Sequence, residues 1–286
     1  MSLYKDIFSV ATVPFISARN LLKIITAQAD DSLRILLYHD IEPFFYAQFE
    51  KQLRFLLKTH RFISPEEFAL YFEGKLPLTG KNLLLTFDDG FYSNRIVAER
   101  ILGPLGIKAL FFVISDFVEL ENLQEAKKFI AEKIQPGRDI YTIPDELYNM
   151  SWQDLQVLLH QGHTIGAHTK SHVQLSKVKS EEELEREIIT SARFVERKLG
   201  IVINDFAFPY GNIQSITPLA LSVARKKFSR IYSGLRGNNI GVSINDIIRR
   251  EATATSDSLL HLYSFINGGV DFKYSSDINQ IKSWYI

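Results

Sequence analysis

Short apolar runs alternate with helix-like patterns along most of this 286-residue chain. An apolar run of four to eight residues is typical of a buried strand, and apolar residues at every third or fourth position are typical of a helix that covers a sheet. Strands that alternate with helices pair in parallel, in layers or in a barrel. We therefore expect an α/β fold with about seven parallel strands, at residues 34–39, 84–87, 109–114, 164–168, 205–211, 230–233 and 246–250.

Two helices between these runs have clear boundaries. Apolar residues at helical spacing predict a helix over residues 181–199 that ends at Gly200. Another helix is expected over residues 94–102, ending before Pro104, because the residue before a proline avoids helical backbone angles.

The alternation of strands and helices indicates the domain organisation. We expect residues 33–286 to form one domain and residues 1–32 to form an N-terminal helical extension. Residues 119–150 fit the alternation least, and we interpret them as an insertion over one face, a lid or a substrate-shaping loop.

The N-terminal extension also bears on location. It lacks the clean apolar core of a secretory signal, and the chain has no stretch of about 20 apolar residues that predicts a transmembrane segment. We expect a cytoplasmic protein, with peripheral contact to a membrane surface left open.

Charge and cysteine content exclude some classes of function. Lys and Arg number 33, as do Asp and Glu, so the chain lacks the basic excess of a nucleic-acid-binding protein. Cysteine is absent, so a metal ion would have to be held by histidine and carboxylate side chains.

Two aspartates follow the expected strand at residues 84–87. Carboxylates are rarely buried unless they are paired or bind a metal, so Asp88 and Asp89 at the end of a buried strand indicate a site. Gly90 permits a sharp turn after them. An ordinary Asp-Asp-Gly turn is the alternative, and this stretch alone does not decide between the two.

Two histidines four residues apart favour a functional site over an ordinary turn. His168 and His172 can reach one ion if the chain between them turns, and with an aspartate they complete a His, His and Asp set used in catalytic zinc sites. Surface histidines are the alternative for this pair. His39 also ends a strand, where a buried structural histidine is the alternative to a catalytic one.

Three motifs together resemble the polysaccharide deacetylases with a NodB homology domain, which are carbohydrate esterase family 4. The resemblance covers roughly residues 34–251 and implies a distorted (β/α) barrel of the NodB type that removes an N-acetyl group from an amino sugar with the help of a metal ion. The motifs are Thr86-Phe87-Asp88-Asp89-Gly90, His168-Thr169-Lys170-Ser171-His172 and Phe206-Ala207-Phe208-Pro209-Tyr210-Gly211.

The resemblance implies roles for the residues in the first two motifs. Asp88 matches the catalytic base of the family, and Asp89, His168 and His172 match its ligands for one divalent metal ion, which we expect to be Zn²⁺. In the third motif, Pro209 and the backbone N–H of Tyr210 match the part that contacts the substrate and stabilises the oxyanion.

One position departs from the commoner family pattern. Ala207 stands where most members have an arginine, as in the branch that includes the poly-N-acetylglucosamine deacetylases. That branch has a strand ending in Tyr-His, which His39 matches, and its histidine is the proposed general acid. Arg249 or Arg250 is expected to replace the missing arginine near the base, and the sequence leaves open which of the two does so.

The resemblance predicts a hydrolase of linear amide C–N bonds that acts on an N-acetylated sugar of a glycan or of a glycan precursor. Two alternatives remain open: an amidohydrolase or esterase for another acylated substrate, and a glycan-binding or scaffold protein without catalysis.

Overall fold

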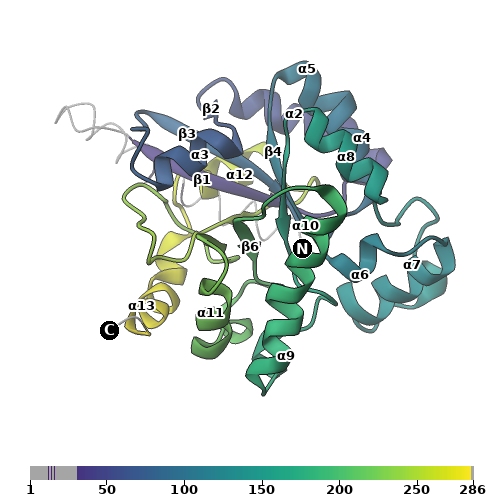
Figure 1. The fold of residues 1–286 in the computed structure, drawn as a ribbon. Coiled ribbons are helices and arrows are strands. Elements are labelled where there is room, and N and C mark those ends of the chain that lie inside the picture. The colour runs from purple at the N-terminus through teal and green to yellow at the C-terminus, as the bar shows by residue number, and fades with distance from the viewer. Residues whose placement is uncertain (1–11, 13, 15, 17–30, 285–286) are drawn as a thin grey trace.

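Figure 1 shows a curled sheet surrounded by helices in the computed structural model, which describes residues 12, 14, 16 and 31–284. In this part of the chain, seven strands lie in the order β7-β6-β5-β4-β3-β1-β8, and the short β2 pairs with the beginning of β3. Every pairing is parallel. The expected α/β class and distorted barrel are therefore confirmed. The strands are β1 Ser32–Tyr38, β2 Arg61–Phe62, β3 Lys81–Phe87, β4 Ala109–Val113, β5 Thr164–Ala167, β6 Asp205–Ala207, β7 Arg230–Tyr232 and β8 Glu251–Ala252.

Helices connect the strands and cover the outside of the sheet (Figure 1). The α-helices are α2 Tyr46–Leu56, α3 Pro65–Phe72, α4 Tyr92–Val97, α5 Gly103–Leu105, α6 Ser115–Val118, α7 Leu123–Phe129, α8 Trp152–His160, α9 Glu181–Glu185, α10 Ser191–Leu199, α11 Pro218–Arg225, α12 Leu259–Ile266 and α13 Ser275–Ser283. The segments Ala98–Leu102, Ile130–Ile134 and Arg186–Thr190 are π-helical.

Successive residues of each strand pack on opposite sides of the sheet, as the extended backbone requires. Leu84 of β3 and Phe112 of β4 lie in the buried cluster inside the curl, whereas Leu85 packs outside against the helices. Counting on from Leu84 in steps of two places Asp88 on the inner side, at the open end of the barrel.

The last predicted strand, at residues 246–250, is wrong. The structure has β8 at Glu251–Ala252 instead, paired with β1. Just before it, Ile248 makes one isolated parallel bridge with Tyr232 of β7. The chain thus passes from the β7 edge of the sheet to the β1 edge, so each pairing lasts only one or two residues and the segment has no long ladder.

The helix expected to end before Pro104 continues to Leu105 and ends at Gly106. Gly103 donates its N–H to the carbonyl of Ala98, five residues back, which is the π-helical pattern. Pro104 then lies in the first turn of α5, where a proline needs no N–H partner. The predicted helix over residues 181–199 is helical throughout, and Gly200 ends it in the left-handed conformation.

The proposed insertion has a core of its own. Ala126 and Ile130 are buried against Phe91 and Phe117, next to α6. Most of the expected N-terminal extension, residues 1–32, lies outside the described residues.

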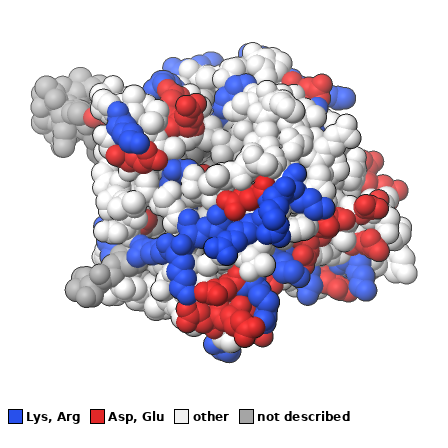
Figure 2. All heavy atoms as spheres, viewed as in Figure 1, with Lys and Arg blue, Asp and Glu red and all other residues white. Residues whose placement is uncertain are grey.

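Charged residues gather by sign on one face. Figure 2 shows Lys and Arg in a band across α10 and α11, with acidic side chains below them over α9. Several of these charges pair: Lys226 binds Glu181 and Glu185, and Lys227 binds Glu196. No helix among the described residues combines the length and the apolar character needed to cross a bilayer.

Candidate active site

Three parallel strands place polar residues at their carboxyl ends, where sites of α/β barrels lie. His39 follows β1, Asp88 follows β3 and His168 follows β5. The N–H of Asp88 donates to the carbonyl of Tyr38 over 2.9 Å, so the chain ends of β1 and β3 remain hydrogen-bonded up to the site.

The backbone of the site is strained at four points. Among the described residues, the non-glycine residues with positive φ are Asp89, Thr169, His172 and Tyr210, with φ of 74°, 66°, 59° and 61°. Such angles cost free energy and persist where surrounding structure enforces them, often at functional sites. All four lie in the three motifs that the sequence singled out.

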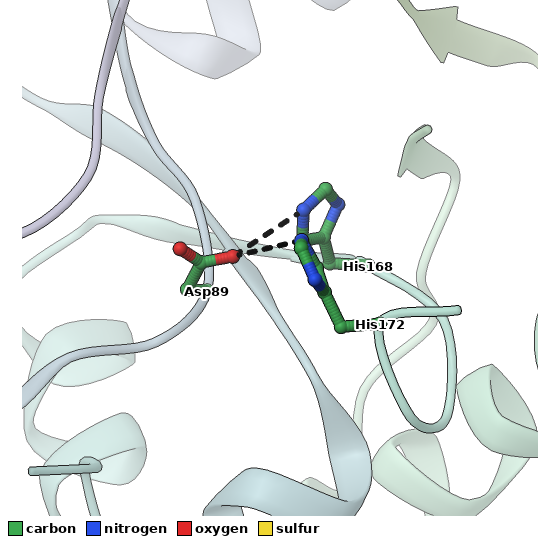
Figure 3. A group of neighbouring side chains, drawn as sticks. All are labelled: Asp89, His168 and His172. Carbon is green, nitrogen blue, oxygen red and sulfur yellow. Dashed lines mark ion pairs between the residues drawn. The ribbon is translucent and has the colours of Figure 1, made fainter. Parts of the chain in front are cut away.

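The turn at Asp89 aims its carboxylate at two imidazoles. Figure 3 shows Asp89 facing His168 and His172. Its Oδ1 lies 3.6 Å from Nε2 of His168 and 3.5 Å from Nε2 of His172. These three residues are buried, and their ligand atoms lie within 4.8 Å of one another.

Backbone carbonyls fix the orientation of both imidazoles. Nδ1 of His168 lies 2.8 Å from the carbonyl oxygen of Ala207, and Nδ1 of His172 lies 2.9 Å from that of Lys133. A carbonyl accepts only, so each Nδ1 carries the proton and each Nε2 presents a lone pair toward Asp89. This arrangement is typical of metal-binding histidines.

These three residues fit a metal ion. Oδ1 of Asp89 is buried and has no hydrogen-bond partner, which is costly for a carboxylate oxygen. Burial raises the pKa of Asp89 to about 7 and lowers the pKa of His168 to about 3. A divalent cation among them would favour the carboxylate and the neutral imidazoles. Two nitrogens and one oxygen form a donor set suited to Zn²⁺.

Asp88 has a different partner. Its two carboxylate oxygens accept hydrogen bonds from Arg250 over 2.6 and 2.9 Å, in a buried bidentate pair. Burial by itself disfavours the carboxylate, but the adjacent Arg250 outweighs it, and the pKa of Asp88 is lowered. Nε2 of His168 lies 3.9 Å from Asp88, so the ionised carboxylate stands directly beside the three candidate ligands.

The alternation of side chains in the segment just before β8 explains why Arg250 rather than Arg249 reaches Asp88. Ile248 belongs to the inner cluster, and Arg250, two residues on, also points inward, between Phe112 and Tyr232. Arg249 points the other way, and its guanidinium donates to the carbonyl of Asn238.

His39 lies at the rim of the site. Its side chain is exposed and lies close enough to both aspartates to favour their ionised forms. Its carbonyl accepts a hydrogen bond from Asn94, which holds the chain at the end of β1. An exposed histidine is not the buried structural residue that was the alternative.

Tyr210 lies beside the three candidate metal ligands. Its ring contacts that of His172 at 4.9 Å between centroids, and its backbone N–H donates to none of the described residues. The chain turns here after Pro209, because Tyr210 and Gly211 have φ of 61° and 62°. Gly211 also packs tightly, since a Cβ on it would lie only 2.3 Å from the backbone nitrogen of Gly234.

Sequence reasoning missed the backbone groups that orient the histidines. The side chains of Ala207 and Lys133 take no part in these contacts, and any residue type supplies a backbone carbonyl. The link from Lys133 also shows that the proposed insertion contacts the site directly.

Comparison with known proteins identifies a family for the chain. The profile of the polysaccharide deacetylase family matches residues 75–227, which is more than half of the chain. No curated protein sequence matches the chain.

Solved structures share the fold. IcaB from Ammonifex degensii aligns with a TM-score of 0.64 and 25% identity, over 84% of this chain and 99% of that one. The de-N-acetylase from Aggregatibacter actinomycetemcomitans aligns with a TM-score of 0.64 and 16% identity, over 82% of this chain and all 100% of the other. At 16% identity the second likeness concerns the fold alone.

A barrel with a His, His and Asp group at the carboxyl ends of its strands defines the class of protein. The chain belongs to the polysaccharide deacetylase family, carbohydrate esterase family 4, and is an enzyme of the carbohydrate de-N-acetylase class.

Proposed function

We propose that this enzyme removes the N-acetyl group from an amino sugar of a glycan or glycan precursor by metal-assisted hydrolysis. The observation that carries the proposal is the buried group of Asp89, His168 and His172 with the ionised Asp88 beside it. Asp89, His168 and His172 would hold one divalent ion, and their donor atoms favour Zn²⁺. A bound ion of this kind polarises a carbonyl oxygen and lowers the pKa of a water molecule.

Asp88 is the proposed general base. It accepts a proton from the attacking water as the water oxygen bonds to the acetamide carbonyl carbon. Arg250 holds both carboxylate oxygens and keeps the group ionised, so Asp88 is ready to accept a proton at neutral pH.

Two further groups act on the tetrahedral intermediate. The backbone N–H of Tyr210, in the turn after Pro209, donates to its oxyanion. His39, as imidazolium, protonates the nitrogen of the sugar while the C–N bond breaks. The products are acetate and a free amino sugar.

The substrate assignment comes from the family and from the site together. Aromatic side chains such as Tyr210 beside the ligand group suit the apolar face of a sugar ring. A cytoplasmic location, with peripheral contact to a membrane, stays a prediction, which cell fractionation would test.

Acetate release tests the reaction. N-acetylhexosamine oligomers should release acetate in the presence of Zn²⁺, and chelation should stop the release. Asp88→Asn should lower turnover by about 10²- to 10⁴-fold, the range for a general base, while bound metal stays constant. Near wild-type turnover of this variant would contradict the assignment of Asp88 as the general base. Activity of the metal-free protein would contradict a metal-assisted reaction.

His39 is tested by substrates with different leaving groups. His39→Ala should lower kcat on N-acetyl sugars by at least about 10²-fold, because the amine leaves only after protonation. An activated ester, whose leaving group needs no proton, should react almost normally with the variant. Equal losses on both substrates would argue against His39 as the acid.

A further inference from the structure

The loop at residues 168–172 carries two of the three candidate metal ligands and is held from outside by groups that the proposed chemistry does not use. Thr169 and His172 have left-handed backbone angles. Such a conformation turns successive N–H groups to one side, where they form a concavity that binds an anion. The N–H groups of Lys170 and Ser171 point toward the same acceptor.

Glu187 supplies the anion. Its Oε2 accepts hydrogen bonds from the N–H of Lys170 over 3.1 Å and from the N–H of Ser171 over 3.0 Å. Its Oε1 accepts a third, from the hydroxyl of Ser171, over 2.8 Å. One carboxylate therefore satisfies three donors of the loop, and hydrogen bonds to a charged acceptor are stronger than neutral ones.

The position of Glu187 in the helix is unusual. It lies in the π-helical turn Arg186–Thr190 between α9 and α10. Ser191 donates its hydroxyl to the carbonyl of Glu187 over 2.5 Å. π-helical turns are rare and occur often at functional sites.

A second π-helical turn holds the other end of the loop. The turn Ile130–Ile134 contains Lys133, whose carbonyl accepts from Nδ1 of His172 and from the hydroxyl of Tyr210 over 3.4 Å. The carbonyls of the loop are also fixed, because the N–H groups of Ser115 and Asp116 in α6 donate to Thr169 and Lys170. The loop thus has partners for its donors and for its acceptors.

We infer that Glu187 is a positioning residue that pre-organises the loop at residues 168–172 for metal binding. Glu187 does not touch the ligand atoms, and it acts by holding the backbone that carries His168 and His172. This inference rests on the proposed function, because it assumes that these histidines bind a metal ion. Glu187 should therefore increase the affinity for the metal ion, and it should make the loop more rigid when no metal is bound.

Metal affinity and hydrogen exchange test the inference separately. In metal-free protein, Glu187→Ala should speed amide exchange at Lys170 and Ser171. The dissociation constant for Zn²⁺, measured by competition with a chelating dye, should rise by about 10- to 100-fold, the range for groups that orient metal ligands. Glu187→Gln keeps an acceptor but loses the charge, so its effect should be smaller.

The matched control is Glu182→Gln, which removes the same charge from an exposed side chain of α9. Its exchange rates and Zn²⁺ affinity should equal those of the wild type. Ser171→Ala should weaken Zn²⁺ binding in the wild type and have no added effect in Glu187→Ala, because the hydroxyl contact is already lost there. It also tests the contact if Glu187→Ala does not fold.

Two results would overturn the inference: unchanged exchange at Lys170 and Ser171 in Glu187→Ala, or a Zn²⁺ affinity within about twofold of the wild type in that folded variant, well short of the loss expected for a ligand-orienting group. A wild-type protein that binds no metal would instead refute the proposed function. The exchange measurement would still report whether Glu187 holds the loop, so the two failures are distinguishable.

Discussion

Adjacent residues of the same type acquire different chemistry in this site. Burial raises the pKa of Asp89 to about 7, whereas Arg250 holds the pKa of Asp88 below its usual value. The left-handed turn at Asp89 separates the two carboxylates, so one faces a guanidinium and the other faces two imidazoles. Their neighbours thus suit Asp88 to accept a proton and Asp89 to bind a cation.

Replacing Arg250 should show that this residue keeps the pKa of Asp88 low. Arg250→Ala leaves Asp88 buried without its cation, so the pKa of Asp88 should rise and the acid limb of kcat/KM should move to higher pH. Removing one partner of a buried pair should also cost about 3–5 kcal/mol in the free energy of unfolding, measured with urea.

Arg249→Ala is the matched control for this change. Its guanidinium contacts the carbonyl of Asn238 and not Asp88, so it should cost only about 1 kcal/mol, the typical value of one hydrogen bond. The pH profile should stay in place. A shift of the acid limb in Arg249→Ala, or none in Arg250→Ala, would contradict the assignment.

At the scale of elements, the short β8 forms the last edge of the sheet, beside β1. Glu251 of β8 is fully buried and binds both Arg34 of β1 and Arg236. Arg34 also pairs with Asp271, so charged side chains rather than a long ladder hold this edge in place. The same edge positions Arg250, the residue before Glu251.

Glu251→Ala should therefore destabilise the protein strongly. The change leaves Arg34 buried with one partner fewer, at a cost of about 3–5 kcal/mol in urea unfolding. Asp271→Asn, which alters the more exposed partner of Arg34, should cost less. If the two changes have equal effects, β8 is not held by the buried part of this network.

At the scale of the whole molecule, the site depends on segments far apart in the chain. Asp88 and Arg250 are 162 residues apart in sequence, and the insertion reaches the loop at residues 168–172 through Lys133. A ligand that binds such a site in the folded state alone stabilises the entire fold.

Metal addition should accordingly raise the thermal stability. Zn²⁺ at about 100 times its dissociation constant should add about 2.7 kcal/mol to the free energy of unfolding, measured as a shift in Tm. A chelator should reverse the shift, and Asp89→Asn should abolish most of it. An equal shift in Asp89→Asn would place the ion elsewhere.

The sequence by itself determined the fold class, most strands and the residues that gather at the site. Apolar runs predict buried strands because burial of their side chains drives folding, and strand ends carry the motifs. The motifs at residues 86–90 and 168–172 contain Asp88, Asp89, His168 and His172, and their match to the family is enough to assign these four residues to one site.

Only the tertiary structure decided how distant parts meet. The strand expected at residues 246–250 was wrong because its pairing switches from β7 to β1 within a few residues, which no local pattern encodes. The choice of Arg250 over Arg249 depended on that same register. The acceptors that contact the loop at residues 168–172, Glu187 and the carbonyl of Lys133, come from helical turns outside that loop. Their contribution is one of geometry, which residue type alone does not specify.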